Sequence, residues 1–270
     1  MTSTRPVPPS ALRVAGARAG LELRLFFRDR AQVAFSFAYP IVMMVIFGSV
    51  FRHDTVAGGV TYRQYFLAGI AATGIMLGSF QALGIRISME RDQRELARLQ
   101  ALGTPAVSYF AGKAAQVLVT VTIQLTVLLV VARYGYDVPM PVDAAHWLTF
   151  VWVAVLGALA GTVLGIAASL LPHRSGAADT QIAVIALILQ FFSGVFFVYS
   201  KLPAWMRDIA EVFPLKWMTQ GMRSAVLPDA AKRAEVSGSW QHGWTAIVLA
   251  LWIVLGVVVC ARRFRWRRLS

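Results

Sequence analysis

The chain alternates between long apolar segments and short polar ones. Six segments hold enough consecutive apolar residues to form a helix that crosses a bilayer, which takes about 20 residues. The pattern therefore predicts an all-α integral membrane protein with six transmembrane helices, which make one domain over residues 31–270. The predicted spans cover residues 31–51, 64–85, 106–132, 147–171, 181–199 and 244–260.

Residues 1–30 have a different pattern and form a separate N-terminal region. Met1–Pro9 contains three prolines and no apolar period, which is typical of a flexible lead. From Ser10, an N-cap candidate, apolar side chains recur along one stripe of a helix and charged ones lie off it. This arrangement predicts an amphipathic helix at the membrane surface. The stripe comprises Leu12, Ala15, Ala19, Leu23, Phe26 and Phe27, and the charged residues off it are Arg13, Arg18, Glu22, Arg24 and Arg28.

A charged island, residues 87–105, separates the second and third predicted spans. Its acidic residues come mostly before its basic ones, an order that suits a helix dipole, and a Gly and a Pro follow as stop signals. The pattern predicts one short helix over about residues 88–103. Such a helix is too polar to enter lipid, so it favours docking on a partner in the aqueous phase, and a solvated helix that contacts nothing is the alternative. Its charged residues are Glu90, Arg91, Asp92, Arg94, Glu95 and Arg98.

The Lys and Arg residues are unevenly distributed among the connecting segments. Most lie in the N-terminal region, the island, the link at residues 172–180 and the tail at residues 261–270. Because cytoplasmic loops are enriched in Lys and Arg, we expect both termini and the island on the cytoplasmic side of the plasma (inner) membrane. Lys113 lies near the start of the third span, and we expect its side chain to reach back to the membrane surface. Residues 200–243 have intermediate polarity, which predicts short helices at the outer membrane surface.

Composition supports the membrane class and narrows the choice of partners. Hydrophobic residues make up 57% of the chain and charged residues 14%, whereas about 25% of a soluble domain is charged. The net charge of +13 is compatible with nucleic acid binding, but the basic residues lie at the ends of apolar runs. Lipid head groups are the commoner partner of basic residues in that position. We therefore expect membrane lipids as partners and no nucleic acid.

The spans contain no carboxylate or histidine side chains, which proton relays and metal sites in membrane enzymes and ion-coupled carriers usually require. Every Asp, Glu and His lies outside them, and the Gly112-Lys113 pair lacks the other residues of a phosphate-binding loop. Any ATP that powers transport must therefore bind to another chain. The polar residues within the spans are better interpreted as interhelical hydrogen-bonding groups than as substrate ligands. They are Ser36, Gln81, Gln116, Gln124, Gln190 and Ser193.

Three stretches of the chain carry family motifs. The first is ERD at residues 90–92 followed by LARLQALGTPAVSYFAGK, which ends in Tyr-Phe-x-Gly-Lys; the second is FFSGVFFVYSKLPAWMRDIAEVFPLKWMTQGMR; and the third is the amphipathic helix. Together with the six spans, they make nearly the whole chain resemble the permease subunit of ABC-2-type exporters, in the drug and lipid exporter branch. Many members carry Gly-Thr where this chain has Arg94-Glu95.

The resemblance implies a function and a set of partners. The island would be a coupling helix that docks on a separate ATPase subunit, which would hold ATP and Mg²⁺, so this chain would be no enzyme and would bind no cofactor. Two permease subunits, identical or closely related, would work with two ATPase subunits to export a drug, an antibiotic or a lipid. The coupling residues would be Glu90, Arg91, Asp92, Arg94, Glu95 and Arg98, and the substrate path would include Phe191, Phe192, Ser193, Phe196 and Phe197.

Two main alternatives remain open at this point, and a membrane enzyme, which would need a paired acid or a metal site that the sequence does not offer, is the third. Within the same family, the exported compound could be a polysaccharide or a lipo-oligosaccharide. From a different class, the chain could be a membrane scaffold that uses the island only to recruit a soluble partner. An ATPase whose turnover depends on this chain would favour transport over recruitment.

Overall fold

The computed structural model describes residues 11–51, 55–56, 58–171 and 177–263. The lead with its N-cap candidate Ser10, part of the link at residues 172–180 and the end of the basic tail lie outside the described residues. The described residues are helical almost throughout and include one two-stranded hairpin. The protein is therefore an all-α membrane protein, as predicted.

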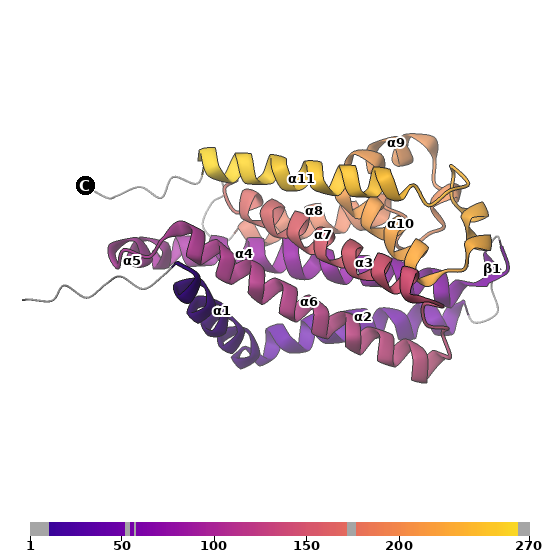
Figure 1. Cartoon of the computed structure of the whole chain (residues 1–270), viewed down its shortest axis with the longest axis horizontal. Coiled ribbons are helices and arrows are strands. Elements are labelled where there is room, and N and C mark those ends of the chain that lie inside the picture. The colour runs from indigo at the N-terminus through magenta and orange to yellow at the C-terminus, as the bar shows by residue number, and fades with distance from the viewer. Residues whose placement is uncertain (1–10, 52–54, 57, 172–176, 264–270) are drawn as a thin grey trace, which may run out of the picture.

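Five helices among the described residues are long and apolar enough to cross a membrane, and they run along the long axis of the molecule (Figure 1). The second is one continuous helix with a π-helical segment in its middle, so the first half of the island continues the second span. The five are α2 (Arg30–Val50); α3, η1 and α4 (Tyr62–Met76, Leu77–Ala82 and Leu83–Asp92); α6 (Ala106–Tyr136); α7 (Ala144–Ala168); and α11 (His242–Arg263).

The predicted fifth span, residues 181–199, is not one long helix. The helix there is α8 (Ala178–Phe192), with 15 residues, and it rises only about 22 Å, less than the about 30 Å of a hydrocarbon core. It ends where Gly194 adopts a φ of +68°, a conformation that favours glycine. The chain then folds back on α3, where a Cβ at Gly69 would lie 2.8 Å from the carbonyl oxygen of Val195. The apolar run is therefore a short helix followed by a packed turn.

The π-helical segment η1 packs closely on α7. A Cβ at Gly165 of α7 would lie 2.7 Å from the carbonyl oxygen of Phe80 and 2.9 Å from that of Ser79. Neither oxygen belongs to a flexible side chain, so only a glycine allows this approach. The opposite face of η1 is thereby held at a fixed position within the bundle.

The two ends of the bundle differ in what they carry (Figure 1). The first, which we call the α5 end, holds α1 (Ala11–Arg28) and α5 (Glu95–Ala101). The opposite end, the β1 end, holds the antiparallel pair β1 and β2 and most of the connection between α8 and α11. The strands are Thr55–Val56 and Val60–Thr61, and the connection comprises η2 (Tyr199–Lys201), α9 (Ala204–Val212), α10 (Pro214–Val226) and η3 (Asp229–Ala234).

The connection between α8 and α11 contains short helices, as predicted, but only one of them has an exposed apolar face. On α9, Trp205 and Ile209 are exposed, as expected for a helix at a membrane surface. In contrast, α10 is buried along its whole length and packs against α3, α7 and α11. The surface position predicted for this segment is therefore wrong for α10.

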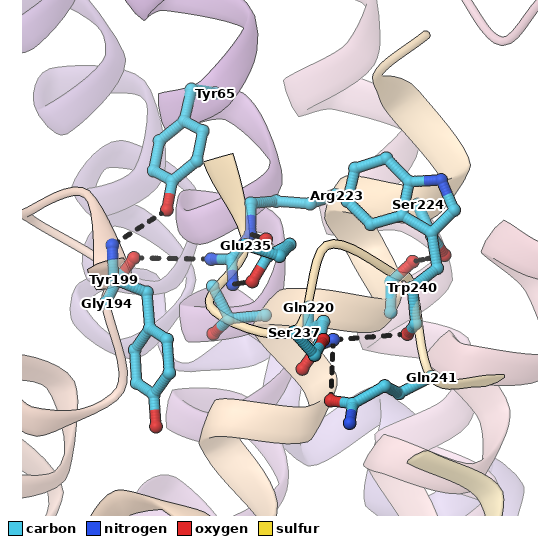
Figure 2. A network of polar contacts seen from close by, with 12 residues as sticks. Tyr65, Gly194, Tyr199, Gln220, Arg223, Ser224, Glu235, Ser237, Trp240 and Gln241 are labelled. Carbon is cyan, nitrogen blue, oxygen red and sulfur yellow. Dashed lines mark hydrogen bonds and ion pairs between the residues drawn. The ribbon is translucent and has the colours of Figure 1, made fainter. Parts of the chain in front are cut away.

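A polar network explains how α10 can be buried despite its polar sequence (Figure 2). Arg223 of α10 is fully buried and pairs with both carboxylate oxygens of Glu235, at 2.5 and 3.1 Å. It also donates to the carbonyl oxygen of Gly194 at 3.5 Å, in the turn that follows α8. Nearby, the Tyr65 hydroxyl accepts a hydrogen bond from the backbone N–H of Tyr199 at 3.1 Å. The polar side chains of this network thus form hydrogen bonds within the protein in place of those they would form with water.

Candidate functional site

One lysine side chain joins three helices at the α5 end. Lys113 of α6 donates to Glu22 of α1 at 2.8 Å and to Glu90 of α4 at 2.5 Å. All three side chains are buried, and a buried charge is tolerated only where other charges and hydrogen bonds compensate it. The pairs therefore fasten α1 and α4 to α6 at the point where the second span passes into the island.

Three further side chains complete this arrangement. Arg18 lies one turn before Glu22 and pairs with it at 2.6 Å, and Arg86 lies one turn before Glu90 and pairs with it at 3.2 Å. The Tyr109 hydroxyl also donates to Glu90, at 2.5 Å. Each buried carboxylate thus has more than one partner, as its burial requires. We call the set the ion cluster, and its members are Arg18, Glu22, Arg86, Glu90, Tyr109 and Lys113.

The ion cluster overturns two expectations from the sequence. Lys113 does not reach back to the membrane surface, because its side chain is fully buried. Glu22 does not lie on an exposed charged face of the amphipathic helix, since it is buried while Leu21 and Leu25 are exposed. Both errors have the same cause: each charge has its partner in another helix, and the periodicity of a single helix does not reveal such a partner.

The sequence does carry one signal for this cluster, the Tyr-Phe-x-Gly-Lys motif at residues 109–113. Its Tyr and Lys both contact Glu90, and its Gly allows α1 to approach α6. A Cβ at Gly112 would lie 2.7 Å from Cγ of Arg18. The partners of the motif were missed because Glu22 and Glu90 lie 91 and 23 residues away from Lys113.

The island forms two helices, not the single helix predicted over residues 88–103. The first, α4, ends at Asp92, and α5 begins at Glu95. Between them, Arg94 adopts a φ of +59°, a left-handed conformation that costs a residue other than glycine about 1–2 kcal/mol. The glycine that many ABC-2-type permeases carry at this position would adopt it freely. The bend therefore forms in this chain without a glycine, and the backbone of Arg94 is strained as a result.

The six charged residues predicted to contact an ATPase differ in their exposure. Glu90 is only 4% exposed and belongs to the ion cluster, so it acts inside the protein and not at its surface. Arg91 is half-buried, and the other four side chains are exposed. Leu102, which follows α5, is 80% exposed although it is apolar. We call the exposed side chains of Arg94, Arg98 and Leu102 the island surface; the contact with an ATPase stays a prediction.

A cavity of about 530 Å³, which we call the main cavity, lies between α2, the η1–α4 part of the second span and α6. Small-molecule sites typically have volumes of about 300–1,000 Å³. Asp29 and Glu95 line the main cavity near the island, and Gly78 and Gln124 line it within the bundle. The main cavity therefore connects the α5 end with the interior of the spans.

Most of the polar span residues gather around this region. Ser36, Gln81 and Gln124 line the main cavity. Ser36, Gln116 and Gln124 also line a cavity of about 20 Å³ beside it, which has room for about one water molecule. The interpretation as interhelical hydrogen bonds holds for Gln190, which accepts a bond from a tyrosine of α2 at 3.0 Å. Gln124, in contrast, has no hydrogen bond to any described residue.

The five residues predicted for a substrate path lie elsewhere, around the end of α8. Phe191 and Phe197 are exposed, whereas Phe192 packs edge-on against a tryptophan of α9. Phe196 packs against Phe191 and two further aromatic rings, and Ser193 is buried. They do not line the main cavity, so their place in a substrate path stays a prediction.

These features define a class of protein. The chain crosses the membrane several times, carries a charged segment at one end of the bundle and holds a cavity of small-molecule size. Among the described residues, no three His, Cys, Asp or Glu side chains group so that they could hold a metal ion. These are the features of a multi-pass membrane protein with a cavity of small-molecule size.

Comparison with known proteins identifies the family. The ABC-2 type transporter family matches residues 19–227, from within α1 to the residue after α10. The chain therefore belongs to the ABC-2 type transporter family, which confirms the resemblance noted in the three stretches.

Named relatives agree with the family match. "Probable multidrug ABC transporter permease YbhR" of Escherichia coli K12 is 21% identical over 188 residues, which are 70% of this chain and 49% of that protein. The protein of the same name from Escherichia coli O157:H7 shows the same identity and coverage. The chain thus spans about half the length of the curated relatives it matches.

Proposed function

We propose that this chain is the membrane subunit of an ABC exporter, which couples ATP hydrolysis by a separate ATPase subunit to efflux of a hydrophobic or amphipathic compound. The ion cluster is the observation that carries the proposal. It joins α4, which leads into the island surface, to α1 and α6 through buried charges. A displacement of the island surface would therefore be passed to the spans and would not be absorbed in a loose loop.

The proposal includes the partners and the orientation. Two permease subunits, identical or closely related, pair with two ATPase subunits that hold ATP and Mg²⁺, and this chain contributes no catalytic residue. The α5 end and both termini face the cytoplasm, and the membrane is the plasma (inner) membrane. The excess of Lys and Arg in the segments assigned to that side supports the orientation.

The main cavity supports a small amphipathic compound over a polysaccharide. It combines apolar side chains such as Phe35, Leu77 and Ile85 with the amides of Gln81 and Gln124. A polysaccharide would need a path lined by polar groups along its whole length, whereas this mixture suits a compound with an apolar body. The relatives' name, with its reference to multidrug transport, agrees with this choice.

The test is the ATPase activity of a candidate ATPase subunit co-expressed with this chain in lipid nanodiscs. We expect the wild type to stimulate turnover and an Arg98→Glu, Leu102→Ser variant to return it to the rate of the ATPase subunit alone. Both changes lie on the island surface, outside the ion cluster and the main cavity, so they alter docking and leave the spans intact.

A matched control replaces an exposed charge at the β1 end, in the variant Asp208→Lys, and should stimulate turnover as the wild type does. Turnover that is the same with wild type, with the island-surface variant and without the chain would contradict coupling. Stable binding of the ATPase subunit without any effect on turnover would instead support the recruitment role.

A further inference from the structure

The main cavity has a polar side chain at its inner end that the protein leaves without a partner. Gln124 is 7% exposed, and none of the described residues forms a hydrogen bond with its amide. The amide packs over glycines of the second span: a Cβ at Gly74 would lie 2.7 Å from Gln124 Nε2, and one at Gly78 would lie 3.8 Å from Oε1. A buried amide normally has partners. Gln124 is therefore placed to bond a molecule within the main cavity.

The other end of the main cavity, its mouth, carries two carboxylates outside any ion pair between described residues. One of them, that of Asp29, caps the start of α2 by accepting from the Gln32 N–H at 3.0 Å. Asp29 and Glu95 are exposed there, and neither forms an ion pair with any residue that the structure describes. The third acid in the lining, Glu90, is already paired with Lys113 and Arg86. The lining thus holds three carboxylates and one guanidinium, that of Arg86, on a chain whose net charge is +13.

The wall between the mouth and the inner end presents aromatic rings. Phe35 and Tyr39 lie one turn apart on α2, with ring centroids 6.1 Å apart and planes inclined by 32°. Both line the main cavity. The face of an aromatic ring attracts a cation through its quadrupole, and it also packs against an apolar body.

We propose that the main cavity selects organic cations: compounds with a positive charge, an apolar body and a hydrogen-bonding group. Asp29 and Glu95 attract the cation at the mouth, Phe35 and Tyr39 pack against its body, and Gln124 bonds its polar group. This inference rests on the proposed export function, since it names the class of compound that the exporter would take.

The test measures binding and requires neither ATP nor a partner. Tetraphenylphosphonium and tetraphenylborate have nearly the same shape and opposite charges, so equilibrium dialysis of both against the purified full chain isolates the effect of charge. We expect saturable binding of the cation and much weaker binding of the anion. In an Asp29→Asn, Glu95→Gln variant the affinity for the cation should fall about tenfold, from about three- to fivefold for each carboxylate.

Two controls separate the charge effect from damage to the fold. Asn caps a helix about as well as Asp, so Asp29→Asn should leave the start of α2 intact. The matched variant Asp208→Asn, Glu211→Gln removes two exposed carboxylates at the β1 end and should bind the cation as the wild type does. The wild type alone gives a further check, because its affinity for the cation should fall as salt screens the exposed mouth.

The role of Gln124 is tested with ethidium, a cation whose amino groups can donate hydrogen bonds. A Gln124→Leu variant should bind ethidium about fivefold more weakly and tetraphenylphosphonium, which has no such group, unchanged. Equal affinity for the two tetraphenyl ions, or an affinity for the cation that neither the mouth variant nor salt changes, would overturn the inference. If the cation binds as expected but the ATPase experiment fails, the site stands and the exporter function falls.

Discussion

At the scale of single residues, the chain places a group of paired charges inside the protein. Glu22, Glu90 and Lys113 are buried although two of them belong to segments whose patterns suggest exposure. Lys113 is the common partner of both carboxylates. Because it joins the amphipathic helix and α4 to α6, we expect it to matter for stability and for the proposed coupling.

Loss of Lys113 alone should destabilise the protein strongly. A Lys113→Met variant leaves Glu22 and Glu90 buried without their shared cation, and removal of one partner from a buried ion pair typically costs about 3–5 kcal/mol. The triple variant Glu22→Gln, Glu90→Gln, Lys113→Met removes these three buried charges together. Arg18 and Arg86 keep contact with water, so the variant should recover most of that loss. Thermal unfolding in detergent, followed by intrinsic fluorescence, measures the difference.

Lys201→Met is the matched control for this prediction, because Lys201 is exposed on η2 at the β1 end. It should unfold at the temperature of the wild type. If the single and triple variants unfold at the same temperature, the charges of the ion cluster do not compensate one another. The cluster would then not hold α1 and α4 on α6 as described.

At the scale of elements, the second span and α7 set the geometry of the cavity. The π-helical segment η1 presents Ser79 and Phe80 to α7, while Leu77, Gly78 and Gln81 line the main cavity. Segments of π-helix are often found at functional sites. Here the close contact with α7 holds one face of η1 in place, and the other face borders the cavity.

A methyl group at the contact between η1 and α7 should disturb both. In a Gly165→Ala variant the added Cβ would meet two backbone oxygens below 3.0 Å, so α7 and η1 must move apart. We expect a loss of about 1–3 kcal/mol of stability, as for other overpacked sites, and weaker binding of tetraphenylphosphonium. Thermal unfolding and the dialysis experiment check the two effects.

Gly16→Ala is the control for the glycine substitution, since a Cβ at Gly16 of α1 would meet nothing within 4 Å. Alanine in a helix is favoured over glycine by about 1 kcal/mol, so this variant should be as stable as the wild type or more stable. Equal behaviour of the two variants would show that η1 and α7 are not in the tight contact described.

At the scale of the whole molecule, the bundle has one end suited to an aqueous partner and one end closed by buried connections. The α5 end carries the island surface, the ion cluster and the mouth of the main cavity, whereas the β1 end holds the network around Arg223 (Figure 2). The proposed orientation puts the α5 end in the cytoplasm, where a nucleotide-hydrolysing partner would be found.

Cysteine labelling in intact cells tests that orientation. The chain has one cysteine, Cys260, so a Cys260→Ala background allows single cysteines to be introduced. We expect Asp208→Cys on α9 to react with a membrane-impermeant maleimide in intact cells and Arg98→Cys on α5 to react only after permeabilisation. Labelling of both positions from outside, or the reverse order, would contradict the proposed orientation.

The pattern of apolar and charged residues was sufficient to predict the class of this protein and the approximate place of most spans. Long apolar segments without charge are stable as helices in lipid, whereas an unpaired charged residue is costly in lipid. The alternation of apolar and charged segments is therefore enough to predict α2, α6, α7 and α11. The motif at residues 109–113 and the charged island could also be recognised in the sequence, because both interrupt or border apolar runs.

Contacts between distant parts of the chain fix where those charges point and which apolar run is not a full span. Lys113 and Glu22 pair across 91 residues of chain, and Gln124 lies against glycines of another helix. The turn at Gly194 and the burial of α10 depend on contacts with α3 and on the partners of Arg223. Periodicity reports which face of a helix is apolar, but it does not report the partner of a polar side chain, because that partner comes from a distant part of the chain.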